Sequence, residues 1–165
     1  MSSNDLERPR LQCHRFSPFC EFQVSSGSAA SSNQIMPPQT VTFAAESESD
    51  PGIVIKVLTD VEKIPGWAPV FADSVERISD THCRVRKNGQ IFDLEVAVNT
   101  SAGTVDYIRE MSQGRRGGAY IRVTPRPLGG SSICMTVPIG ADTTEAEVRK
   151  VLADEVSELI RMARS

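Results

Sequence analysis

Tyr107 and Arg109 are the residues best placed to do chemistry on a small molecule. In the segment TVDYIREM (104–111) they alternate with apolar residues on one face of an expected strand. If that face points inward, Tyr107 offers a hydroxyl and Arg109 a fixed cation in an apolar pocket. A buried arginine needs a carboxylate, from the protein or from a ligand, which would favour an acidic or phenolic ligand. The alternative register places Ile108 inward and Arg109 outward.

Other groups that could carry out catalysis are few. The two histidines are His14, near the start of the chain, and His82, which we expect to be exposed beside a turn. Asp93 and Glu95 share one strand face, and paired carboxylates can do acid–base work in a dry site. The apolar residues of that strand lie on its other face, so we expect both carboxylates to face solvent. No GxSxG, P-loop or HExxH pattern occurs, and we predict no catalytic residues.

The four cysteines do not form a metal-binding pattern. Cys13 and Cys20 flank His14 in CHRFSPFC, but the second pair of ligands that a zinc site needs is missing at regular spacing. Cys83 and Cys134 lie far apart in expected strands, where we interpret them as small buried apolar residues. We therefore predict no metal and no cofactor, and we expect no disulfide in a cytoplasmic protein.

Length and composition exclude several classes of protein. The 165 residues suit one domain, and the net charge of −3 gives no basic surface for nucleic acid. Aromatic residues make up only 5% of the chain, which leaves few platforms for stacking bases. No apolar run could span a bilayer, and the first residues lack the pattern of a signal peptide. We expect a cytoplasmic protein with no integral membrane segment that binds no nucleic acid.

Residues 1–39 differ in composition from the rest. The stretch 25–34 is rich in Ser, Ala and Gly, and Pro37–Pro38 follows it. Such a segment buries too little apolar surface to offset its ordering entropy, so we interpret 1–39 as a flexible leader. Its aromatic residues could instead dock on the folded part. The folded domain is expected to span 40–165.

A broken helix follows the first expected strand. Asp50 can accept hydrogen bonds from the first free N–H groups, and Pro51 suits the first turn, where its missing N–H costs nothing. Prolines and a glycine then break the helix around Trp67, the only tryptophan. The apolar stripe of this helix consists of Val54, Val57, Leu58 and Val61.

Short turns join a series of alternating strands. Asn88–Gly89 is the strongest hairpin signal because both residues tolerate positive φ. A glycine- and arginine-rich turn is expected at 113–118. The expected strands cover 40–46, 74–79, 82–87, 90–99, 104–111, 119–125 and 131–139.

One long amphipathic helix, about 143–164, follows the strands. Its capping box is formed either by Asp142 with Glu145 or by Thr144 with Glu147. Its apolar stripe consists of Val148, Val151, Leu152, Val156, Leu159, Ile160 and Ala163.

This order of elements predicts an α+β fold. A curved antiparallel sheet of about seven strands wraps around the C-terminal helix, with short helices after the first strand. An apolar space would remain between sheet and helix, with its mouth near the broken helix.

The stretch VLTDVEKIPGWAPVFADSV (57–75) resembles the START-like, polyketide cyclase/dehydrase (SRPBCC) superfamily, which has the helix-grip fold. In these families the first helix ends in D-x-x-x-x-P-x-W-x-P, matched here by Asp60, Pro65, Trp67 and Pro69. The resemblance covers 40–164. It implies a deep cavity for a hydrophobic or amphipathic molecule, such as a lipid, a quinone or a polyketide-like compound. Members include lipid carriers, hormone receptors, polyketide aromatases and quinone-binding proteins.

Binding or transport of such a ligand is the expected function, because histidines and convergent carboxylates are scarce. One alternative is an aromatase/cyclase-type enzyme that shapes a reactive chain and stabilises an enolate with Arg or Tyr. Another is a protein-interaction domain with a filled core. Since sheet edges can pair, the protein is expected to be a monomer or a weak homodimer. The expected ligand-binding residues are Trp67, Phe71, Phe92, Tyr107, Arg109, Met135 and Ile160.

Overall fold

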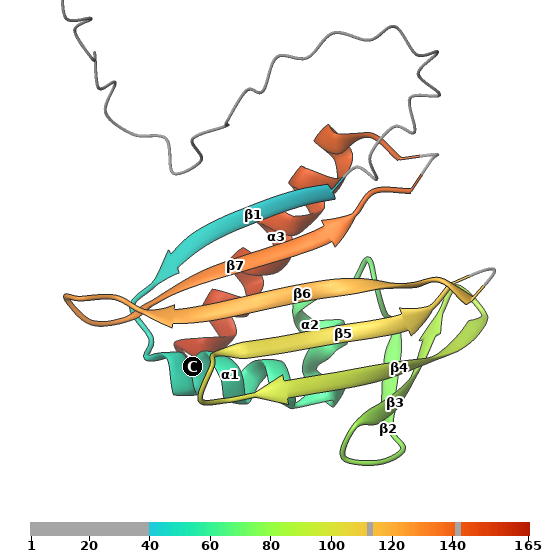
Figure 1. The fold of residues 1–165 in the computed structure, drawn as a ribbon, viewed down its shortest axis with the longest axis horizontal. Coiled ribbons are helices and arrows are strands. Elements are labelled where there is room, and N and C mark those ends of the chain that lie inside the picture. The colour runs from blue at the N-terminus through green and yellow to red at the C-terminus, as the bar shows by residue number, and fades with distance from the viewer. Residues whose placement is uncertain (1–39, 112–113, 141–142) are drawn as a thin grey trace, which may run out of the picture. The chain divides into compact units, whose positions relative to one another are not determined.

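The computed structural model describes residues 40–111, 114–140 and 143–165 (Figure 1). The expected leader, 1–39, lies outside the described residues. The elements in chain order are β1 (Thr40–Ser47), α1 (Pro51–Thr59), the 3-10 helix η1 (Val61–Lys63), α2 (Ile64–Trp67), β2 (Ser74–Arg77), β3 (His82–Lys87), β4 (Gln90–Asn99), β5 (Thr104–Glu110), β6 (Arg116–Pro125), β7 (Ser131–Pro138) and α3 (Glu145–Ala163). The predicted α+β helix-grip fold is confirmed.

The seven strands form one antiparallel sheet in the order β1-β7-β6-β5-β4-β3-β2. Strands β2 to β7 pair with their chain neighbours, as expected from their short turns, and β1 pairs with β7 at the far edge. In Figure 1 the C-terminal helix α3 passes behind β7 and β6, and it packs against β1, α1 and α2. The sheet therefore wraps around α3, with α1 and α2 at one end.

The alternating pattern of β4 and β5 sets which side chains face α3. On β4, Leu94 and Val96 are buried. On β5, Val105 and Tyr107 are buried and Arg109 is half-buried. Tyr107 and Arg109 also line the space between the sheet and α3, whereas Ile108 does not, so the register with Tyr107 and Arg109 inward is the one that the structure adopts.

Side-chain caps were predicted for the N-termini of both α1 and α3, and only the cap of α3 forms. Asp50 precedes α1, but its side chain makes no capping hydrogen bond, and only its backbone carbonyl accepts from Ile53 and Val54. That detail of the prediction was wrong, because the side chain is exposed to water. At α3, Thr144 and Glu147 form the capping box, and the hydrogen bonds from Thr144 lower the pKa of Glu147.

The glycine-rich stretch 113–118 was expected to be a turn, but β6 begins at Arg116 and includes Gly117 and Gly118. A Cβ on Gly118 would overlap the backbone carbonyl of Tyr107, at 2.8 Å from its carbon. Glycine is needed here because β6 and β5 approach closely, which is a common role of a glycine inside a strand. The structure also ends β2 at Arg77, two residues earlier than expected. No helix in the described ranges is long and apolar enough to cross a membrane.

Candidate ligand-binding cavity

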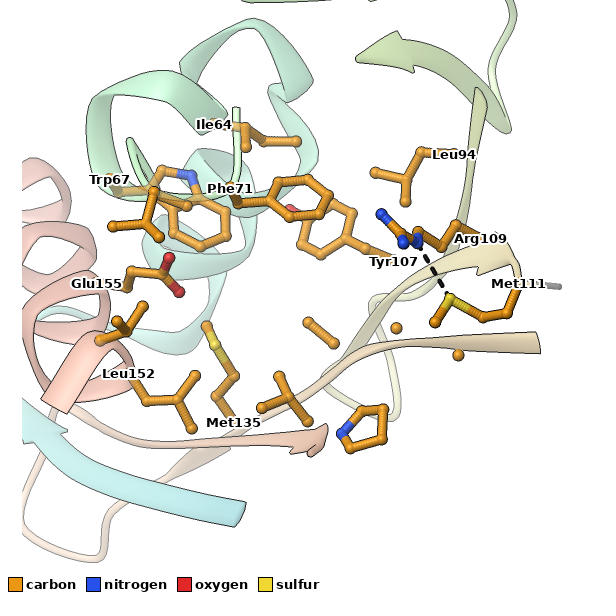
Figure 2. Close-up of a pocket in the computed structure, with 18 residues that line it drawn as sticks. Ile64, Trp67, Phe71, Leu94, Tyr107, Arg109, Met111, Met135, Leu152 and Glu155 are labelled. Atoms are coloured by element: carbon orange, nitrogen blue, oxygen red, sulfur yellow. Dashed lines mark hydrogen bonds between the residues drawn. The ribbon is translucent and has the colours of Figure 1, made fainter. Parts of the chain in front are cut away.

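A cavity of about 360 Å³ lies between the sheet and α3, beside α2 (Figure 2). Side chains from β4 to β7 form one wall, and α3 forms another. The segment from α2 to Phe71 also contributes lining residues. The residues that line the cavity are Ile64, Trp67, Ala68, Val70, Phe71, Leu94, Tyr107, Arg109, Met111, Gly117, Gly118, Ala119, Met135, Val137, Pro138, Val151, Leu152 and Glu155.

The cavity is predominantly apolar and opens at a rim of exposed side chains. Leu94, Met135 and Leu152 are buried, whereas Val70 and Met111 are 61% and 43% exposed. This places the opening near the break that follows α2, as expected from the sequence. Only three of the lining residues are ionisable: Tyr107, Arg109 and Glu155.

Arg109 is held in place by an aromatic ring and a thioether sulfur, and not by an opposite charge. Its guanidinium carbon lies 4.9 Å from the centre of the Phe92 ring. Its Nε donates to Sδ of Met111 at 3.2 Å (Figure 2). Phe92 in turn packs edge-on against Phe71, with ring centres 5.7 Å apart. No carboxylate of the described residues contacts Arg109. The cation is therefore oriented toward the cavity but not neutralised.

Glu155 is a buried carboxyl that faces the cavity from α3. Its side chain is only 8% exposed, and it forms no hydrogen bond or ion pair within the described ranges. Burial raises its pKa to about 7, because the charged form loses its hydration. In Figure 2 Glu155 and Arg109 lie on opposite sides of the cavity.

Tyr107 contributes its ring to the cavity, while its hydroxyl is already engaged. The hydroxyl donates to the backbone carbonyl of Leu58, and burial raises the pKa of the phenol. The sequence predicted that Tyr107 offers its hydroxyl to the pocket. The structure differs, because the last turn of α1 lies close enough to Tyr107 for Leu58 to accept the hydroxyl hydrogen. The ring packs against Trp67 with centres 6.0 Å apart.

Trp67 lies in the core as well as against the cavity. It is 3% exposed, and its indole N–H is the one fully enclosed side-chain N or O among the described residues without a hydrogen-bond partner. Because such a group loses hydration without compensation, this N–H carries a cost in folding.

The structure brings together five of the seven residues named from the sequence: Trp67, Phe71, Tyr107, Arg109 and Met135. The other two lie elsewhere. Phe92 does not line the cavity but contacts Arg109 and Phe71, which do. Ile160 packs against the hydrophobic core.

Glu155 was missed by the sequence reasoning. A signal was present, because the residue lies three positions after Leu152 and four before Leu159, on the buried face of the same helix.

The remaining reactive groups lie away from the cavity. Cys83 is buried, and burial raises the pKa of its thiol to about 11, which makes it a poor nucleophile. His82 is exposed at the start of β3. Within the described part of the chain no group of His, Cys, Asp or Glu could hold a metal ion. Cys13, His14 and Cys20 lie outside that part.

Comparison with known proteins defines the class of fold. The sequence matches no family model and no curated protein. Among solved structures, a START superfamily protein from Mycobacterium smegmatis is 12% identical, with a TM-score of 0.54, covering 74% of this chain and 92% of that chain. The Zhui aromatase/cyclase from Streptomyces sp. R1128 is 14% identical, with a TM-score of 0.54, covering 76% and 93%.

The solved structure of a protein from Mesorhizobium loti also has a similar fold. It is 17% identical, with a TM-score of 0.58, covering 75% of this chain and 96% of that chain. The chain therefore has the START-like helix-grip fold. At these identities the likeness concerns the fold and does not by itself indicate a function.

Proposed function

We propose that this protein binds or carries a hydrophobic or amphipathic small molecule in the cavity between the sheet and α3. The observation that carries the proposal is the apolar cavity of about 360 Å³, which falls in the size range of small-molecule sites. A filled-core interaction domain would have no such cavity. The START-like neighbours support the same class of function.

Arg109 favours a ligand that has an acidic or phenolic group. Its guanidinium is half-buried beside apolar walls without a carboxylate from the described residues. A ligand anion would supply the missing charge, while its apolar body displaces water from the walls. Lipid-like acids, quinone-like phenols and polyketide-like enols share these two properties.

Trp67 provides the direct test, because it lines the cavity and is the only tryptophan. We expect decanoic acid to change its emission with saturation. Arg109→Met should weaken this binding about tenfold or more, since a charge-assisted contact is lost. Arg86→Met is the matched control, because Arg86 is exposed and does not line the cavity. The proposal fails if neither emission nor melting temperature responds to the acid.

An aromatase/cyclase-type enzyme is the second candidate. Arg109 and Glu155 supply a cation and a carboxyl to the same apolar cavity. The cation could stabilise an enolate, and the carboxyl, with its pKa of about 7, could move a proton near neutral pH. Such an enzyme would speed the cyclisation of a poly-β-keto thioester, and Glu155→Gln would slow that reaction without weakening binding.

A further inference from the structure

Glu155 is the one acidic residue of α3, a helix described along its whole length, that has no partner. Glu145 and Asp154 pair with Arg149 and Lys150, which lie on the exposed side of the helix. The other two acidic residues also have partners, since Glu147 binds Thr144 and Glu158 pairs with Arg161.

The packing of α3 does not explain a carboxyl at position 155. The position lies on the buried stripe between Leu152 and Leu159, where an apolar side chain would pack without cost. A largely buried carboxyl without a hydrogen bond is costly in either protonation state. Its surroundings on the cavity side are apolar, apart from Tyr107, whose hydroxyl bonds to Leu58, and Arg109, which lies across the cavity (Figure 2).

We propose that the cavity takes an amphipathic acid that carries a hydroxyl at its far end. The acidic group pairs with Arg109, and the hydroxyl bonds to Glu155. This inference rests on the proposed binding function and narrows its ligand class. A hydroxyl fits Glu155 in both protonation states, because it donates to a carboxylate and accepts from a carboxylic acid. A plain alkyl end would leave the carboxyl without a partner.

The test compares matched chain molecules by isothermal titration calorimetry on the full chain. The probes are decanol, decanoic acid and ω-hydroxydecanoic acid, with the ω-hydroxyoctanoic and ω-hydroxydodecanoic acids to vary the span. In the wild type we expect the best ω-hydroxy acid to bind about tenfold more tightly than the plain acid of equal length, the gain of one hydrogen bond to a charged group.

Variants assign that gain to Glu155. In Glu155→Leu the ω-hydroxy acid should bind no more tightly than the plain acid, because its buried hydroxyl has no partner there, while plain decanoic acid keeps its affinity. Glu155→Gln should keep part of the gain, because an amide also donates and accepts. Arg109→Met should weaken both acids alike and retain the preference for the hydroxyl. Asp154→Leu is the control, because Asp154 is exposed and paired with Lys150.

The inference is overturned if the hydroxyl gives no gain at any chain length, or if the gain persists in Glu155→Leu, while the plain probes still bind. Failure of decanol and of every acid to bind the wild type would instead reject the proposed function itself. The two results are distinct, because decanol and decanoic acid do not require Glu155.

Discussion

The Tyr107 hydroxyl on β5 donates a hydrogen bond to the backbone carbonyl of Leu58 in the last turn of α1. Carbonyl groups in the last turn of a helix lack partners within the helix, so this bond satisfies one of them. It also joins the sheet to the broken helix and removes the phenol hydrogen from the cavity. Polar contact with a ligand is therefore left to Arg109 and Glu155.

Tyr107→Phe should lower the free energy of unfolding by about 1–3 kcal/mol, because the buried Leu58 carbonyl loses its donor. Binding of an apolar probe should change little, since the ring that lines the cavity is kept. Urea unfolding and a Trp67 emission titration measure the two effects. Tyr120→Phe is the control, since Tyr120 is half-buried and has no hydrogen bond from its hydroxyl among the described contacts. A loss of binding with unchanged stability would contradict this role of Tyr107.

Gly117 and Gly118 offer a matched pair of substitutions. Gly118→Ala should destabilise the fold by at least about 3 kcal/mol, because its Cβ would overlap the Tyr107 carbonyl and neither backbone can move alone. Gly117→Ala should fold normally, since its Cβ would lie 3.5 Å from Cγ of Met111 and 3.7 Å from Cγ of Pro138, in ordinary contact.

Because Gly117 lines the cavity, its alanine variant should also weaken ligand binding. Thermal unfolding and calorimetric titration of both variants check these expectations. Equal stability of the two variants would show that β5 and β6 do not approach as closely as described.

Glu155 should make stability depend on pH in a defined direction. Its pKa is about 7 in the folded protein and 4.5 as the ordinary value. The folded state therefore holds its proton more tightly than the unfolded state does. Below about pH 4.5 Glu155 is protonated in both states, and its burial then costs no stability through ionisation. The free energy of unfolding falls as pH rises from 4.5 to 7 and then levels off. The total loss should be about 3 kcal/mol.

Comparison of the wild type with Glu155→Leu isolates this contribution. Urea unfolding across that pH range should show that the wild type loses stability relative to Glu155→Leu as pH rises, because the leucine does not titrate. The other ionisable residues of the cavity do not interfere, since arginine stays charged and burial raises the pKa of Tyr107 still further. Parallel curves for the two proteins would mean that Glu155 is solvated.

Trp67 should tolerate phenylalanine far better than alanine. Trp67→Ala removes a buried ring and should cost about 3–5 kcal/mol. Trp67→Phe loses less volume and also eliminates the enclosed N–H that lacks a partner, so the two effects oppose each other and should leave a cost below about 1.5 kcal/mol. Chemical unfolding followed by circular dichroism measures both. A cost above 3 kcal/mol for phenylalanine would indicate that the N–H has an unseen partner.

Much of the fold could be predicted because its elements follow simple periodicities. On β4, Leu94 and Val96 alternate with Asp93 and Glu95. The two apolar residues are buried. The two carboxylates lie on the other face, where Asp93 pairs with Arg84 and Glu95 with Arg116. Asn88 and Gly89 form the expected hairpin, both with positive φ. Each of these outcomes depends on residues close together in the sequence.

The features that could not be predicted depend on contacts between distant segments. Position 118 in β6 requires a glycine because β5 lies too close to leave room for a side chain. From the sequence alone, the glycine-rich stretch resembles a turn. Whether Tyr107 bonds a ligand or Leu58 depends on where α1 ends relative to β5. A glutamate is normally assigned to the wet side of a helix, so Glu155 was overlooked although its spacing placed it on the buried side.

Native mass spectrometry of the protein as expressed, followed by denaturing extraction, tests the central claim most directly. We predict a retained noncovalent mass whose extract is an amphipathic acid or phenol, and we predict that Arg109→Met retains less of it. An empty protein, whose melting temperature is also unchanged by a panel of hydrophobic acids and phenols, would contradict the claim that the cavity is a ligand-binding site.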